Sequence, residues 1–150
     1  MKQAIAVLAA AVAIWAVPAR AESDADVARN VLALERQAMD GWLKGNPDVQ
    51  LAIADPQITY YHVMLDQRLE GLPALKALYE PYRGRPLFDR YEILNPKVQV
   101  SGEVAILTYD MARHNGTAVS HWNSTQVYQR KKEGWRVIHS HWSNVKPPQP

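Results

Sequence analysis

The sequence predicts an α+β fold, a cone-shaped, curved antiparallel β-sheet with N-terminal helices packed on its concave face. Two observations indicate this class. Apolar residues in the first half of the chain recur at helical spacing, whereas the second half holds four strand-like runs joined by short turns. Helices gathered on one face of an antiparallel sheet make an α+β domain. We expect the curvature of the sheet to leave a pocket between the sheet and the helices.

Residues 1–21 are expected to be a secretory signal peptide that is cut after Ala21. Lys2 supplies the basic start, residues 4–17 form an apolar run, and small residues flank Arg20. The apolar run is short for a membrane span, although an uncleaved N-terminal anchor is the alternative. We therefore expect a secreted or periplasmic protein with no membrane segment after cleavage.

The remaining chain, about 129 residues, is long enough to build one hydrophobic core. We expect one domain at residues 22–145 and a disordered tail at 146–150. Without Lys2 and Arg20, the 17 basic residues fall to 15 and equal the 15 acidic ones. No basic surface is left to favour nucleic acid as a partner. The chain has no cysteine, which excludes disulfides, a thiol nucleophile and a zinc–thiolate site.

Residues 24–44 are predicted to form the first helix. Its apolar positions recur at spacings of three and four residues, and they comprise Val27, Val31, Leu34, Ala38 and Trp42. Ser23 or Asp24 can cap its start, and the Gly-Asn-Pro sequence that follows it ends the helix. A second, short helix is predicted at about residues 47–54, with Pro47 in its first turn.

Strands and one further helix follow. The β-branched and aromatic run at 58–64 predicts the first strand. The chain then turns at Gly71 and enters a helix that runs from about Pro73 to residue 83. Four more strands are predicted at residues 89–100, 103–114, 118–130 and 135–145. Each separator between these four contains glycine and suits a hairpin turn, so the four strands are expected to form an antiparallel meander.

The last strand carries the most distinctive polar pattern, "GWRVIHSHWSNV" at residues 134–145. Alternation along a strand places His139 and His141 on one face. If Gly134 closes a three-residue bulged turn, Lys131 pairs with Trp135, Val127 faces His139 and Thr125 faces His141. The shared face is then His121, Asn123, Thr125, Val127, Trp135, Val137, His139 and His141. A four-residue loop would instead bring Trp122, Ser124, Gln126 and Tyr128 beside the histidines. We favour the bulged turn.

The histidines could serve in proton transfer or in metal binding, or they could be purely structural. His141 could exchange a proton near neutral pH, with His62 and Tyr60 on the first strand as partners. The alternative is that both histidines of the last strand only satisfy hydrogen bonds within the sheet. His139 and His141 are also spaced to chelate one ion, and His62 or His121 could complete three nitrogens. Because histidine pairs alone are weak evidence, we expect neither a metal nor another cofactor.

Aromatic residues could line a cavity for a ring-bearing ligand. They are Trp42, Tyr60, Tyr61, Trp122 and Trp142. The alternative is that they build the core and a dimer interface, where aromatic residues usually dominate. The predicted ligand-binding set is Trp42, Tyr60, His62, His121, Thr125, His139 and His141, which combines apolar walls with a few hydrogen-bonding groups.

Four stretches resemble one superfamily. They are "DGWLKGNPDVQLAIADPQITYYH" at 40–62, "LEGLPAL" at 69–75, "VAILTY" at 104–109 and "HWNSTQVYQRKKEGWRVIHSHWS" at 121–143. Together with the element order, they are similar to the nuclear transport factor 2-like superfamily. The nearest branch is the SnoaL-like proteins and the association domain of calcium/calmodulin-dependent protein kinase II. The resemblance implies a cone-shaped α+β fold and self-assembly.

The resemblance alone does not determine the function, because this superfamily contains isomerases, dehydratases, hydrolases and non-enzymatic domains. Ketosteroid-isomerase-like members carry a carboxylate base on the first strand, and residues 58–63 contain no Asp or Glu. We therefore expect an exported domain that forms homo-oligomers and binds an unknown small, partly hydrophobic ligand. The alternative is a SnoaL-like enzyme that uses His141 or His62 as acid and base.

Overall fold

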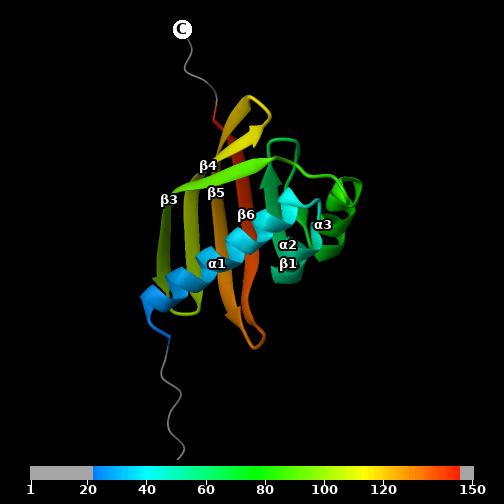
Figure 1. The fold of residues 1–150 in the computed structure, drawn as a ribbon. Coiled ribbons are helices and arrows are strands. Elements are labelled where there is room, and N and C mark those ends of the chain that lie inside the picture. The colour runs from blue at the N-terminus through cyan, green and yellow to red at the C-terminus, as the bar shows by residue number, and fades with distance from the viewer. Residues whose placement is uncertain (1–21, 146–150) are drawn as a thin grey trace, which may run out of the picture.

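The computed structural model describes residues 22–145. The signal peptide expected at 1–21 and the tail expected at 146–150 lie outside the described residues. The described chain forms three α-helices, one short 3₁₀-helix and a single six-stranded sheet (Figure 1). No helix within residues 22–145 has the length and apolar character needed to cross a membrane.

The helices agree with the sequence prediction. α1 spans Asp24–Leu43, and the backbone N–H of Asp26 donates to the Ser23 hydroxyl at its start, as expected for an N-cap. α2 spans Asp48–Ile53 and α3 spans Leu72–Tyr79, with the 3₁₀-helix Glu80–Tyr82 directly after it. Val27, Val31, Ala38 and Trp42 of the predicted apolar stripe are buried.

The sheet has the order β2-β1-β6-β5-β4-β3. Its strands are β1 Ala54–His62, β2 Leu69–Glu70, β3 Arg90–Ser101, β4 Val104–Asn115, β5 Ala118–Lys131 and β6 Gly134–Asn144. The predicted meander is confirmed as β3 to β6, each strand antiparallel to the next. β1 pairs with β6 in parallel, so the sheet is mixed. The two-residue strand β2 was not predicted, because so short a run has no measurable period.

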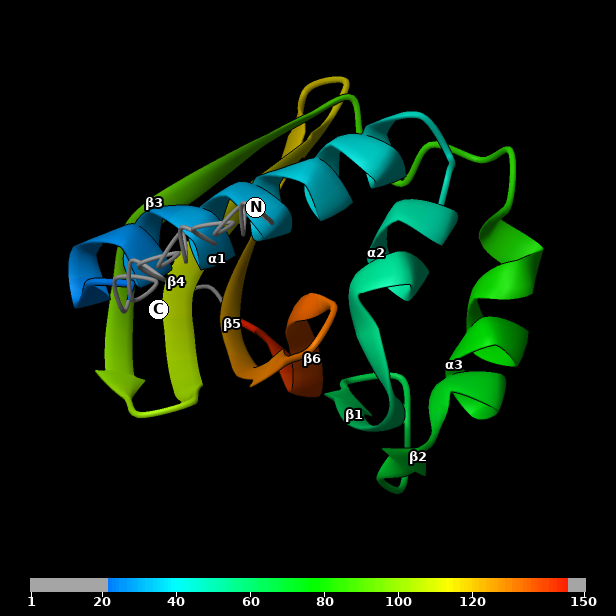
Figure 2. The same cartoon turned by 90° about the horizontal axis from the view of Figure 1, so that it is seen from below.

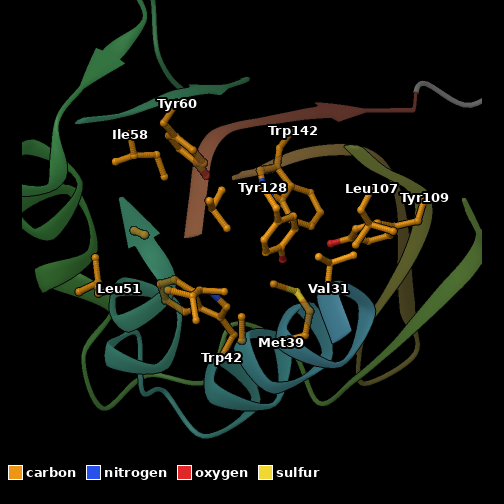
Figure 3. Close-up of a cluster of buried hydrophobic side chains, with 14 of the residues drawn as sticks. Val31, Met39, Trp42, Leu51, Ile58, Tyr60, Leu107, Tyr109, Tyr128 and Trp142 are labelled. Atoms are coloured by element: carbon orange, nitrogen blue, oxygen red, sulfur yellow. The ribbon is translucent and has the colours of Figure 1, made fainter. Parts of the chain in front are cut away.

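The helices lie on one side of the curved sheet. α1 crosses the sheet, whereas α2 and α3 stand beside β1 (Figures 1 and 2). Buried side chains from α1 and from the sheet point toward one another in the space between them (Figure 3). We call the sheet surface beneath the helices the concave face. Among its buried residues are Tyr60, Trp122, Tyr128 and Trp142.

The opposite surface of the sheet is the open face, defined by Thr59, Tyr61, Ile106, Thr108, Thr125, Val127, His139 and His141. Cross-strand pairing joins these residues, because Thr59 is opposite His139, Tyr61 is opposite His141 and Val127 lies between Ile106 and His139. No helix within residues 22–145 covers them, and every one is exposed or half-buried.

The β5–β6 register agrees with only part of the prediction. Lys131 pairs with Gly134 across a two-residue turn, so the predicted pairing of Lys131 with Trp135 is wrong. An irregularity between Val127 and Tyr128 then accommodates Ile138 as one extra residue. Beyond it the predicted pairs Val127–His139 and Thr125–His141 are present. As a result Trp135 and Val137 lie buried with Tyr128 on the concave face, and not beside the histidines.

Candidate functional site

A cavity of about 370 Å³ lies between the concave face and the helices. Its walls come from α1, α2, the segments 64–65 and 78–88, and strands β1, β4, β5 and β6. The lining residues are Met39, Trp42, Gln50, Tyr60, His62, Met64, Leu65, Leu78, Tyr79, Tyr82, Leu87, Phe88, Met111, Arg113, Trp122 and Trp142. A volume of this size suits a small organic molecule.

Aromatic rings packed edge to face form one wall of the cavity. The Trp42 ring meets Tyr79 at 4.8 Å between centroids and Tyr82 at 6.4 Å, and Tyr60 meets Tyr79 at 6.1 Å. The Trp42 indole N–H donates to the Gln50 side-chain oxygen, which fixes the indole ring. Burial raises the pKa of Tyr60 to about 12, so its hydroxyl remains a neutral hydrogen-bonding group. This wall is therefore mainly apolar, with the Tyr60 hydroxyl and the Gln50 amide as polar groups.

Arg113 on β4 brings a positive charge into this aromatic cavity. Its guanidinium lies over the Phe88 ring at 5.2 Å and the Trp122 ring at 5.1 Å. Nη2 donates to the Leu87 carbonyl oxygen at 3.2 Å, whereas the buried Nε–H has no partner within the described chain. Arg113 forms no ion pair with any carboxylate of residues 22–145. Burial lowers the pKa of Arg113, yet an arginine remains charged at neutral pH.

His62 at the end of β1 stands next to this charge. Its ring stacks on Trp122 at 5.5 Å and on Tyr60 at 6.0 Å. The backbone N–H of Met64 donates to Nδ1 at 3.2 Å, so the neutral ring carries its proton on Nε2. Burial and the charge of Arg113 both lower the pKa of His62, which favours this neutral form. His62 therefore offers an N–H donor.

The predicted ligand-binding residues divide between the two faces of the sheet. Trp42, Tyr60 and His62 line the cavity, as do Trp122 and Trp142. The other four predicted residues, His121, Thr125, His139 and His141, do not line it. Thr125, His139 and His141 belong to the open face, and alternation along β5 puts His121 on that side too. The concave positions of β5 and β6 are taken by larger or buried groups, including Trp122, Tyr128, Ser140 and Trp142.

This placement corrects the acid–base and metal hypotheses. His141 cannot reach the cavity, so it cannot act there together with His62. His62 and the pair His139 and His141 lie on opposite faces, and residues 22–145 contain no cluster of three or more His, Cys, Asp or Glu that could hold a metal ion. The three-nitrogen site that the sequence offered as a possibility, and that we did not predict, is therefore not assembled within residues 22–145 of one chain.

Sequence reasoning missed Arg113, which is the main polar group of the cavity. Arg113 is two residues after Met111 and four after Tyr109, so strand alternation places it on the same side as these buried residues. The available signal was the alternation itself, which places the basic residue Arg113 on the same side of β4 as apolar residues that are expected to be buried.

A second polar group is buried beneath α1, outside the cavity lining. The Glu35 carboxylate accepts hydrogen bonds from the hydroxyls of Tyr109, at 2.5 Å, and Tyr128, at 2.8 Å. Glu35 is 1% exposed, and burial raises the pKa of its carboxyl. This cluster links α1 to β4 and β5.

Comparison with known proteins agrees with this architecture. Residues 27–146 match the family model of the calcium/calmodulin dependent protein kinase II association domain. A candidate ketosteroid isomerase from Parabacteroides distasonis is 30% identical, with 78% of this chain and 86% of that chain covered and a TM-score of 0.71. No curated protein matches the sequence.

Two further solved structures share the fold at lower identity. An NTF2-like protein of unknown function from Pseudomonas putida is 17% identical, with 85% of this chain and 99% of that chain covered and a TM-score of 0.73. The CaMKII hub of S. rosetta is 21% identical, with 86% of this chain and 100% of that chain covered and a TM-score of 0.65. Given the match over residues 27–146, the chain belongs to the calcium/calmodulin dependent protein kinase II association domain family, within the NTF2-like fold.

Proposed function

We propose that this chain is an exported, self-associating domain that binds a small, partly hydrophobic acid in its concave cavity. The observation that carries the ligand part is Arg113, a guanidinium held between two aromatic rings without a carboxylate partner in residues 22–145. A half-buried cation without a counter-ion carries a desolvation cost, and a ligand carboxylate would relieve that cost.

The remaining cavity lining supports an acid with an apolar body. Arg113 suits a planar carboxylate, and the neutral His62 Nε2–H can donate beside it. The walls formed by Trp42, Tyr79 and Trp142 would enclose a ring or a short hydrocarbon chain. This arrangement supports binding over proton transfer, because His62 is held neutral and its Nδ1 is occupied by a backbone N–H.

Self-association has separate support. The chain belongs to a family named for association, and the open face carries exposed apolar side chains that include Tyr61 and Ile106. A sheet surface with apolar groups and few charges is suited to contact with a second copy. Export is supported by the signal-peptide pattern of residues 1–21.

Phenylacetate and its neutral analogue phenylacetamide test the ligand class by calorimetric titration. We expect the protein to bind phenylacetate at least about tenfold more tightly than phenylacetamide, because only the acid can pair with Arg113. Arg113→Met should remove this preference. Arg85→Met, at an exposed arginine outside the cavity lining, should keep it.

Native mass spectrometry of the exported protein gives an independent readout. A copurified acid of a few hundred daltons should be present in the wild type and in Arg85→Met but absent from Arg113→Met. Equal binding of phenylacetate and phenylacetamide, or an unchanged preference in Arg113→Met, would show that the cavity does not select acids.

A further inference from the structure

The open face holds two histidines on β6, one of the two central strands of the sheet. β6 lies between β1 and β5 in the sheet, and His139 and His141 project from it on the side away from the helices. Two histidines separated by one residue on a strand direct both rings to the same side, which is a spacing that chelates a metal ion. The Tyr61 ring lies 6.0 Å from the His139 ring and 5.8 Å from the His141 ring, so all three gather at one point.

A hydrogen bond orients His139 outward. Its Nδ1 lies 2.8 Å from the Thr59 hydroxyl oxygen, and that hydroxyl is itself directed at the Ile138 carbonyl, 3.5 Å away. When the hydroxyl donates to this carbonyl, its oxygen accepts the Nδ1–H, and Nε2 keeps a free lone pair. Metal-binding histidines are commonly held by such a contact on the other ring nitrogen. His62 has the opposite arrangement, since its Nδ1 accepts a backbone N–H.

The charged surroundings of the pair are modest. Arg68 is the nearby cation, and it is paired with Glu70. Exposed His141 completes a two-nitrogen site.

One chain supplies only two nitrogens, because residues 22–145 hold no larger group of metal-binding side chains. Association through the open face would supply the other two. In a two-fold interface the same patch meets itself, and residues near its centre meet their own counterparts. Two pairs of imidazoles facing each other would provide the four nitrogens of a tetrahedral zinc site.

We propose that His139 and His141 form half of a transition-metal site that the same two residues of a second copy complete, so that zinc strengthens self-association through the open face. This inference rests on the proposed self-association and is independent of ligand binding, because the cavity is on the other face of the sheet.

Sedimentation velocity and native mass spectrometry test the site on the exported protein, first with chelator and then with one zinc ion per two chains. We expect one bound zinc per two chains and a dissociation constant for self-association that falls at least about tenfold. His139→Gln and His141→Gln should lose both effects. His121→Gln is the control, because His121 is on the same side of the sheet but on β5, opposite Ala112 of β4. This variant should keep both effects.

The outcomes separate this inference from the proposed function. Self-association that does not respond to zinc, or equal zinc binding by the wild type and His141→Gln, would overturn the metal site and leave the proposed function intact. Zinc bound by single chains without a change in association would overturn the sharing of the site. A monomer under both conditions would overturn the metal site and the proposed self-association together, whereas phenylacetate binding would still report on the cavity.

Discussion

Glu35 lies in an environment that is unusual for a carboxyl group. It is buried, forms no ion pair with residues 22–145 and accepts hydrogen bonds from Tyr109 and Tyr128. Burial raises its pKa above the usual 4.5, so the folded protein holds this proton more tightly than the unfolded chain does. Protonation of Glu35 therefore favours the folded state.

This shift predicts a pH dependence of stability. The stabilisation from Glu35 protonation should be fully present below pH 4.5 and should be lost as the pH rises through the raised pKa of the folded protein. Urea unfolding at a series of pH values should show this decline in the wild type and a flatter profile in Glu35→Gln. Glu133→Gln, at an exposed turn position, is the control. Identical slopes in Glu35→Gln and the wild type would mean that the Glu35 pKa is not raised.

At the same scale, the sequence predicted the cavity only in part. Strand alternation correctly grouped His139, His141 and Thr125 on one face. Alternation does not say which face of the sheet the helices cover. The covered face is the one whose side chains together bury more apolar surface. Trp122, Tyr128 and Trp142 bury far more apolar surface than the histidine set does, so they take the concave face.

The elements were largely predictable because their signals are local. The α1 stripe, the capping Ser23 and the glycine-containing turns each lie within a few residues of the structure they produce. The parallel pairing of β1 with β6 has no local signal, since it joins strands separated by most of the domain. The extra residue in β6 could not be predicted either, because the sequence near Ile138 is compatible with a regular strand as well as with an irregular one.

The irregularity in β6 predicts unequal losses of stability for two deletions. Without Ile138, the sequence Trp135 to Trp142 alternates regularly, so Val137, Ser140 and Trp142 would all remain on the concave face. We expect this variant to fold with a loss of less than about 2 kcal/mol. Deletion of Ser140 would also leave Trp142 on the concave face, but it would put His139 in the fully buried position of Ser140, so we expect it to cost at least about 2 kcal/mol more than deletion of Ile138.

Circular dichroism and urea unfolding of the two deletion variants provide the test. Both variants lack one residue of the same strand, so each serves as the control for the other. If both deletions were equally damaging, Ile138 would not be an extra residue, and the paired register on either side of it would need another explanation.

For the whole molecule, the two faces of the sheet keep the two proposed tasks apart. The concave face and the helices enclose the cavity, whereas the open face, which no helix of residues 22–145 covers, is the surface that we propose for contact with a second copy. The fold class could be predicted from the order of helices and strands, and the family match confirms it. The separation of the two faces predicts that self-association can be disrupted without loss of ligand binding.

Ile106→Lys tests this separation. Ile106 lies on β4 opposite Val127 of the open face and is 37% exposed, so a lysine there can reach water in the single chain. At an interface between two copies, the same lysine would be buried without a partner, which is costly. We expect sedimentation velocity to show weaker self-association by at least about a hundredfold, which corresponds to roughly 3 kcal/mol.

Phenylacetate affinity in the same variant should remain within about twofold of the wild type, because Ile106 and the cavity lie on opposite faces of the sheet. Ala33→Lys, on the exposed side of α1, introduces the same charge away from the open face and should leave self-association unchanged. If Ile106→Lys associates as strongly as the wild type, the chains must meet through another surface. If it also loses phenylacetate, association and binding are coupled, and the two faces do not act independently.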